Sequence, residues 1–167
     1  MIRLLRPSAV VLLAACMLGA TTASFAQPAQ KLEATYSTGR LHAQAQWETP
    51  YRPGVEPDSR VIAHIAPFEL RLAIPKEYFS PPRPVRVYVS LPLTAIGMTG
   101  PGSLELTWQT GGRFIPGRVT AGQRALLYQG LVDGPVLLDQ MRYTVRVDAA
   151  DALDRLEFDP VYEIEPQ

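Results

Sequence analysis

Apolar and polar residues alternate along several stretches of this chain, a pattern typical of β-strands that bury one face. The clearest stretch is 41–48, where Leu41, Ala43, Ala45 and Trp47 alternate with polar residues. We expect these four side chains to face a core, with Trp47 as one of its anchors. The same period of two recurs at 68–74, 85–91, 104–109 (which includes Trp108, a second expected anchor) and 141–147.

Weaker apolar runs predict further strands, and turn-forming residues such as Pro101-Gly102 and Gly111-Gly112 separate them. These weaker runs are 31–36, 61–65, 125–128, 136–138 and 161–164. The best helical candidate, 149–156, is long enough for only one or two turns. The sequence therefore predicts an all-β fold, a single antiparallel β-sandwich, immunoglobulin-like or related, with about 8–10 strands and at most one short helix.

The first 26 residues have the layout of a secretory signal peptide, with a basic start, an apolar middle and small residues near the cut. Ser24-Phe25-Ala26 fits ordinary cleavage before Gln27. The apolar run is shorter than the about 20 residues of a transmembrane helix. We expect a bacterial protein exported to the periplasm, with a flexible lead-in at 27–30 and one domain at 31–167.

A second cleavage site competes with the first. Leu13-Ala14-Ala15-Cys16 resembles the lipobox of bacterial lipoproteins, in which the cysteine becomes the lipidated first residue. The segment after Cys16 continues apolar through Ala20, whereas a lipoprotein usually turns polar there. We expect cleavage after Ala26. The alternative is a membrane-anchored lipoprotein that is lipidated at Cys16.

Composition narrows the classes of function. Removal of Arg3 and Arg6 with the leader leaves 14 basic against 16 acidic residues, a net charge of about −2. Such a balance offers no basic field for nucleic acid. Cys16 is the only cysteine, so a domain cut after Ala26 has no disulfide. About 140 residues remain, enough for one domain with its own core.

Catalytic and metal-binding signals are scarce. The chain has two histidines, His42 and His64, and no G-x-S-x-G elbow, which argues against a hydrolase triad. We expect His42 to face solvent and His64 to be partly buried with its hydrogen bonds satisfied. Neither histidine lies in a zinc or copper ligand pattern, so we predict no metal and no cofactor. The carboxylates after Asp148 resemble a solvated face more than a glycosidase pair or a calcium loop.

Two loops are candidate surfaces for a protein partner. The proline-rich loop 49–59 carries Tyr51 and Arg52, residue types enriched at interface centres. The uncharged loop 92–102 holds Leu93, Ile96 and Met98. If exposed, these three form an apolar patch that a partner or membrane would cover. We expect them instead to fold back over one end of the sandwich.

These observations favour an exported, non-enzymatic binding or accessory protein of the bacterial cell envelope, with a protein partner. One alternative is a carbohydrate-binding module, or a glycan-active enzyme that uses carboxylates, since Tyr51, Tyr78, Phe79 and Tyr88 are candidates for outward-facing rings that stack on sugars. The other is an envelope assembly component anchored by lipid at Cys16. Fold alone decides between none of these.

Overall fold

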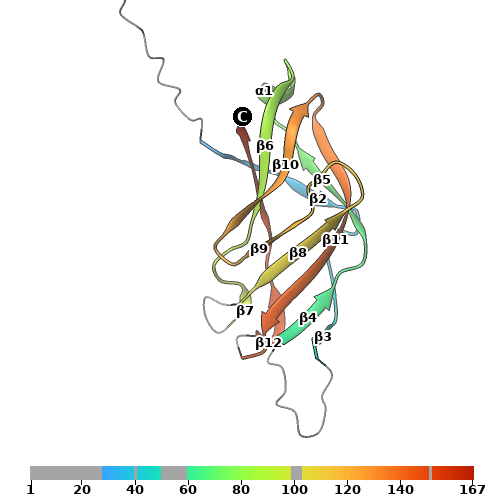
Figure 1. Ribbon diagram of the computed structural model, residues 1–167, viewed down its shortest axis with the longest axis vertical. Helices are drawn as coiled ribbons and strands as arrows, with labels where there is room; N and C mark the ends of the chain where they lie inside the picture. Colours follow the sequence, from blue (N-terminus) through green and yellow to red (C-terminus); the bar gives the residue numbers. More distant parts are fainter. Residues whose placement is uncertain (1–27, 40, 50–59, 99–102, 151) are drawn as a thin grey trace, which may run out of the picture.

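The computed structural model describes residues 28–39, 41–49, 60–98, 103–150 and 152–167, with side chains from Leu156 onward in the last range. Within these residues the chain forms thirteen strands and one short helix in two packed layers (Figure 1). In chain order the elements are β1 (Gln30–Leu32), β2 (Ala34–Tyr36), β3 (Ala45–Trp47), β4 (Arg60–His64), β5 (Phe68–Ala73), α1 (Lys76–Phe79), β6 (Arg83–Ser90), β7 (Ile96–Met98), β8 (Glu105–Thr110), β9 (Gly117–Thr120), β10 (Arg124–Val132), β11 (Val136–Asp148), β12 (Ala152–Glu157) and β13 (Val161–Pro166).

The first sheet has four antiparallel strands in the order β1-β13-β6-β10. Its inner face follows the predicted period of two, because Val85, Val87 and Val89 of β6 are buried while the residues between them are not. Tyr162 and Ile164 do the same on β13. The face of this sheet that the alternation predicted to be apolar is therefore the one that packs on the second sheet.

The second sheet is built around β11, which is 13 residues long. Its first part pairs with β5 and its last part with β4, so these two strands follow one another along one edge of β11. On the other edge β8 pairs with β11, and β9 pairs with β8. β2 pairs with β5, and β3 pairs with β4. The hydrogen-bonded order along this path is β2-β5-β11-β4-β3.

The core lies between the two sheets. Its largest fully buried side chains are Trp108, Tyr143, Tyr162, Phe68, Leu70, Leu72, Leu104, Leu106, Leu127, Leu137, Met141 and Ile164. The ring of Phe68 packs edge-on against Tyr143, with centroids 4.8 Å apart. The antiparallel β-sandwich predicted from the sequence is confirmed, and its immunoglobulin-like subtype stays a prediction.

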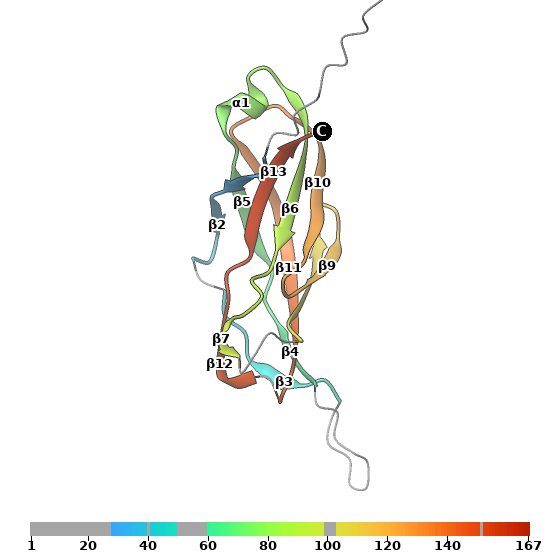
Figure 2. The ribbon, with the colours of Figure 1, turned by 90° about the vertical axis from the view of Figure 1, so that its left-hand side faces the viewer.

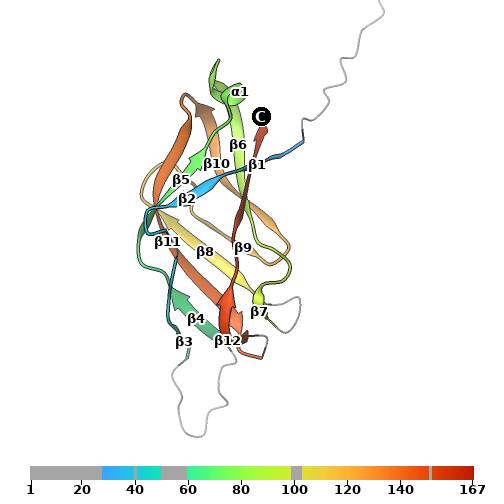
Figure 3. The same cartoon turned by 180° about the vertical axis from the view of Figure 1, so that it is seen from behind.

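The two layers do not cover each other along their whole length. Beyond β6 and before β13, the chain forms a separate two-stranded sheet of β7 and β12. Figures 2 and 3 place this small sheet at the end of the molecule that also holds β3 and β4, opposite the end that holds α1. In the described part of the chain, β7, β12 and their loops lie across from the second sheet at this end (Figure 2).

Two sequence-based expectations about local structure are wrong. Residues 149–156 form no helix among the described positions, since β12 begins at Ala152; α1 lies instead in the proline-bracketed stretch after β5. The predicted strand at 41–48 is reduced to the three residues of β3. In addition, its apolar residues are not core, because Ala43, Ala45 and Trp47 are exposed and Leu41 is only half-buried.

Candidate functional site

The predicted partner-binding residues fall into two groups. Cys16, Tyr51 and Arg52 lie outside the described residues. In the other loop, Leu93 is 59 % exposed and Ile96 is 70 % exposed. The expectation that this loop folds back as core is wrong for these two side chains. Only Met98 behaves as expected, since it is half-buried and packs against the core.

A cleft of about 1330 Å³ opens at the end of the sandwich where β7 and β12 replace the first sheet. One wall is the inner face of the second sheet, whose alternating apolar residues come from β3, β4 and β11. They are Ala45, Trp47, Val61, Ala63, Tyr143, Val145 and Val147. Among the described strands, none of the first sheet reaches the rim of this wall (Figure 2), and Trp47 is 56 % exposed although it lies on the predicted inner face.

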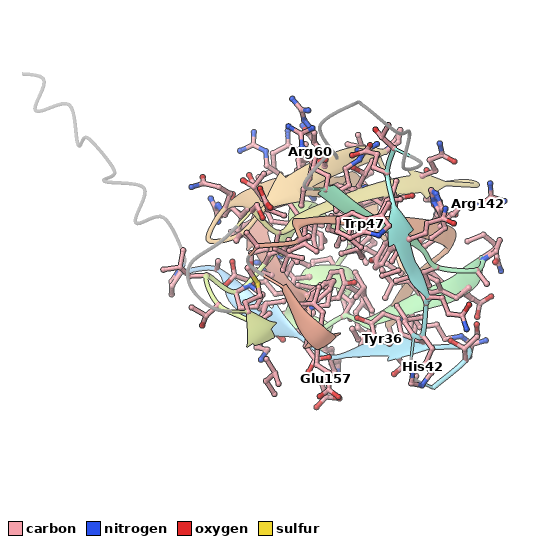
Figure 4. The ribbon with its side chains drawn as sticks, turned by 90° about the horizontal axis from the view of Figure 1, so that it is seen from below. Tyr36, His42, Trp47, Arg60, Arg142 and Glu157 are labelled. Carbon is pink, nitrogen blue, oxygen red and sulfur yellow. The ribbon has the colours of Figure 1, made fainter. Side chains whose placement is uncertain are left out.

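The opposite wall comes from the loops around β7 and β12. It includes Ile96, Leu156 and Phe158. Figure 4, which looks into this end, shows Trp47 on one side and Tyr36, His42 and Glu157 on the other. The two walls therefore present apolar side chains that come from segments far apart in the sequence.

The polar lining of the cleft includes two carboxylates and one histidine. It consists of His42, Gln44, Thr94, Glu157 and Asp159 together with two tyrosines. Among the described lining residues there is no lysine or arginine. Arg60 and Arg142 lie toward the outside of the molecule in the same end view (Figure 4).

Three tyrosine hydroxyls meet beside the cleft. The hydroxyl of Tyr143 lies 2.7 Å from that of Tyr162, and the hydroxyl of Tyr36 lies 3.4 Å from that of Tyr162. Burial raises the pKa of all three phenols, and for Tyr36 the nearby Asp159 charge raises the pKa further. The cluster is therefore neutral at ordinary pH and holds all its protons.

This cluster has one more proton than its internal contacts use. Three hydroxyls carry three protons, and the two contacts between them take two. When Tyr143 donates to Tyr162 and Tyr162 donates to Tyr36, the remaining O–H belongs to Tyr36. Tyr36 is half-buried and lines the cleft. In this arrangement the site can donate a hydrogen bond to an acceptor on a bound molecule.

An ion network on the outer face fastens the β3 wall to the rest of the sheet. Arg146 of β11 donates from Nε to Glu48 Oε1 at 2.9 Å and from Nη1 to Glu105 Oε1 at 3.2 Å. These hydrogen bonds, to Glu48 first and Glu105 second, raise the pKa of the guanidinium. Because the pairs are partly solvated, each stabilises the fold by only about 0–1 kcal/mol. Their role is to hold the residue after β3 against β11.

Both histidines of the chain are exposed. His64 is exposed, so the prediction of a partly buried histidine is wrong; its Nδ1 lies 3.2 Å from Thr144 Oγ1, across the β4–β11 pair. His42 is exposed as predicted. Within the described ranges, no three His, Cys, Asp or Glu residues gather in a way that could hold a metal ion.

The aromatic residues considered for sugar stacking are mostly covered. Tyr78 is buried, and Phe79 packs against the core. The guanidinium of Arg124 lies 4.2 Å above the ring of Tyr88. Tyr51 lies outside the described residues. The ring that is open to a ligand is instead Trp47, which the alternation had assigned to the core.

Comparisons with protein-family models, with curated protein sequences and with solved structures find no match to this chain. Among the described residues, no helix has the length and apolar character needed to cross a membrane.

Proposed function

We propose that this chain is an exported, non-catalytic binding protein of the bacterial cell envelope that holds the apolar part of a ligand or partner in its end cleft. The observation that carries the proposal is the pair of apolar walls on which two large side chains are exposed, Trp47 on one wall and Ile96 on the other. Soluble proteins seldom expose neighbouring large apolar side chains unless something binds to them.

The energetics favour an apolar occupant. Complete burial of one aliphatic or aromatic side chain stabilises a complex by about 1.5–3 kcal/mol. Trp47 and Ile96 are each more than half exposed, so a ligand that covers both recovers much of this free energy. The cleft is somewhat larger than the about 300–1,000 Å³ of pockets for small molecules, which suits an elongated group.

The hydroxyl cluster adds a requirement for a polar group on the ligand. When the hydrogen-bond chain runs from Tyr143 through Tyr162 to Tyr36, the O–H of Tyr36 can donate to an oxygen or nitrogen acceptor. A pure hydrocarbon would leave this donor unpaired, at a cost of about 1–3 kcal/mol once water is displaced. The favoured ligand therefore has an apolar body and at least one hydrogen-bond acceptor.

The cellular location in this proposal comes from the leader. Cleavage after Ala26 gives a periplasmic protein, whereas cleavage before Cys16 gives a lipoprotein at a membrane surface. The intact mass of the processed protein from periplasm and from membranes separates the two, because only the lipoprotein begins at an acylated cysteine.

The main alternative is carbohydrate binding. It is favoured by one observation, the exposed ring of Trp47 in a cleft that also holds Gln44 and two carboxylates, Glu157 and Asp159. Sugars stacked on that ring would shift its fluorescence, so titration with a panel of soluble oligosaccharides tests this alternative directly.

The proposal itself is tested by titration with the uncharged apolar dye N-phenyl-1-naphthylamine. We expect saturable binding that Ile96→Glu weakens about tenfold or more, a loss of about 1.4 kcal/mol or more. Leu131→Glu is the matched control, because Leu131 is 61 % exposed and lies outside the cleft. Absence of saturable binding, or equal weakening by both variants, would contradict the proposal.

A further inference from the structure

β3 is an edge strand at the mouth of the cleft. In the described part of the chain it pairs with β4 alone and stands last in its sheet. The amide of Glu48 donates to the carbonyl of Arg60 at 3.0 Å, which fixes the direction of the backbone groups in the strand. Since these groups alternate along a strand, Gln46 faces β4, and the N–H and C=O groups of Ala45 and Trp47 face away from it.

The same two residues line the cleft with their side chains. Ala45 and Trp47 both belong to the cleft wall, so β3 combines an apolar face with backbone groups that have no partner among the described residues. A strand added beside β3 would place every second side chain on the face that Trp47 presents. This combination suits an extended polypeptide, because the edge supplies main-chain hydrogen bonds and the cleft accepts alternate apolar side chains.

Charge favours a polypeptide with a basic side chain as the occupant. The described lining includes the acidic residue Asp159, and His42 is its one basic residue. The charge of Asp159 reaches into the site, since it contributes to the raised pKa of Tyr36. A lysine or arginine side chain would be complementary to this charge.

We propose that the cleft binds an extended segment of a partner protein, which pairs with the edge of β3 that faces away from β4, inserts alternate apolar side chains and carries a lysine or arginine near Asp159. This inference rests on the proposed function and specifies its ligand. The spare tyrosine O–H would donate to a carbonyl of the segment.

The probes are synthetic peptides of about nine residues with blocked ends, longer than the three-residue β3. In each peptide an apolar residue (valine, leucine, isoleucine or phenylalanine) alternates with threonine, and one lysine lies near one of the two ends. In a first matched set glutamate replaces the lysine. In a second matched set every second backbone nitrogen is methylated. We expect the lysine set to bind, with a blue shift of Trp47 emission and slower amide exchange at Ala45 and Trp47. Methylation should weaken binding about tenfold or more, and glutamate should weaken it severalfold.

A variant of the protein tests the edge from the other side. Ala45→Pro removes an N–H that faces away from β4, so the pairing of β3 with β4 keeps its own hydrogen bonds. We expect this variant to lose peptide binding about tenfold or more. Its circular dichroism spectrum and urea unfolding curve should stay close to those of the natural chain, which shows that the loss does not come from unfolding.

The outcomes separate this inference from the proposed function. If the dye binds but no peptide does, or if methylated and unmethylated peptides bind equally, strand addition is wrong and the apolar cleft stands. Two further results would also contradict strand addition by a partner protein. One is binding of the chain to anionic vesicles and not to peptides, and the other is a dimer of the chain that Ala45→Pro dissociates. If neither dye nor peptide binds, both proposals fail.

Discussion

The two tryptophans of this protein lie on predicted inner faces of the same sheet and have opposite environments. Trp108 on β8 is 1 % exposed, and its indole N–H donates to the carbonyl of Ile115 at 2.7 Å. Trp47 on β3 is 56 % exposed and lines the cleft. The difference is set by what lies opposite, since Trp108 lies in the core between the two sheets, whereas Trp47 lies at the end where β7 and β12 form a separate small sheet (Figure 2).

This contrast separates residues that hold the fold from residues that are available for binding. The packing around Trp108 is so close that a Cβ on Gly117 would lie 2.8 Å from the ring atom Cζ2. Around Trp47, a ring of the same size faces open space in a cleft of about 1330 Å³. Stability should therefore depend on the first ring and ligand binding on the second.

The largest expected effect comes from the paired truncations Trp108→Ala and Trp47→Ala. Loss of the buried ring leaves a cavity and an unpaired carbonyl, so we expect the free energy of unfolding to fall by about 3–5 kcal/mol. Loss of the exposed ring should cost less than about 1 kcal/mol. Urea unfolding curves measure both changes. Similar costs for the two variants would show that Trp47 is also core.

A smaller loss of stability is expected from Asp139→Ala, a change in the buried part of the sandwich outside the cleft. The Asp139 carboxylate is buried and accepts the backbone N–H groups of Phe114 and Gln140, each at 2.7 Å. Removal of this acceptor leaves the buried amide of Phe114 unpaired, at a cost of about 1–3 kcal/mol in urea unfolding. The dye titration should be unchanged, because Asp139 lies outside the cleft. A loss of dye affinity would mean that the structure around Asp139 affects the cleft.

The smallest effect at neutral pH is expected from Tyr143→Phe, which removes one hydroxyl from the cluster. We expect a cost of about 0.5–1.5 kcal/mol for the lost hydrogen bond to Tyr162.

At alkaline pH the sign of the tyrosine effect is fixed by the raised pKa values. Above pH 10 the unfolded tyrosines lose protons while the buried ones keep them, so the folded state binds more protons and stability falls as pH rises. Tyr143→Phe removes the contribution of one buried tyrosine to this pH dependence of stability. The free energy of unfolding between pH 8 and about pH 11 should then fall less steeply in the variant than in the natural chain. An equal or steeper fall would show that Tyr143 is not held neutral by burial.

The sequence predicted which face of each strand points inward better than it predicted whether the opposite sheet covers that face. The period of two correctly assigned Val85, Val87, Val89 and Trp108 to buried faces. It also placed Trp47 on the cleft side of its strand, but a single strand carries no information about where the opposite sheet ends. The small residues Ala43 and Ala45 beside Trp47 were the available signal, because they bury little apolar area even in a core.

Most of the cleft could not be read from local sequence. Its walls combine 41–47 with 92–96 and 156–160, and only the topology brings these segments together. The hydroxyl cluster likewise joins Tyr36, Tyr143 and Tyr162 from three strands. The predicted loop residues Leu93 and Ile96 were identified by their apolar character, and of the two only Ile96 lines the cleft.

The central claim is that the inner face of the second sheet is open at the Trp47 end. Acrylamide quenching of tryptophan fluorescence tests it most directly, with Trp47→Phe used to isolate the signal of Trp108. The account predicts that the natural chain has a strongly quenched, red-shifted component that the variant lacks, and that N-phenyl-1-naphthylamine protects this component. If the natural chain and the variant are quenched equally weakly, Trp47 is covered and the cleft does not exist in solution.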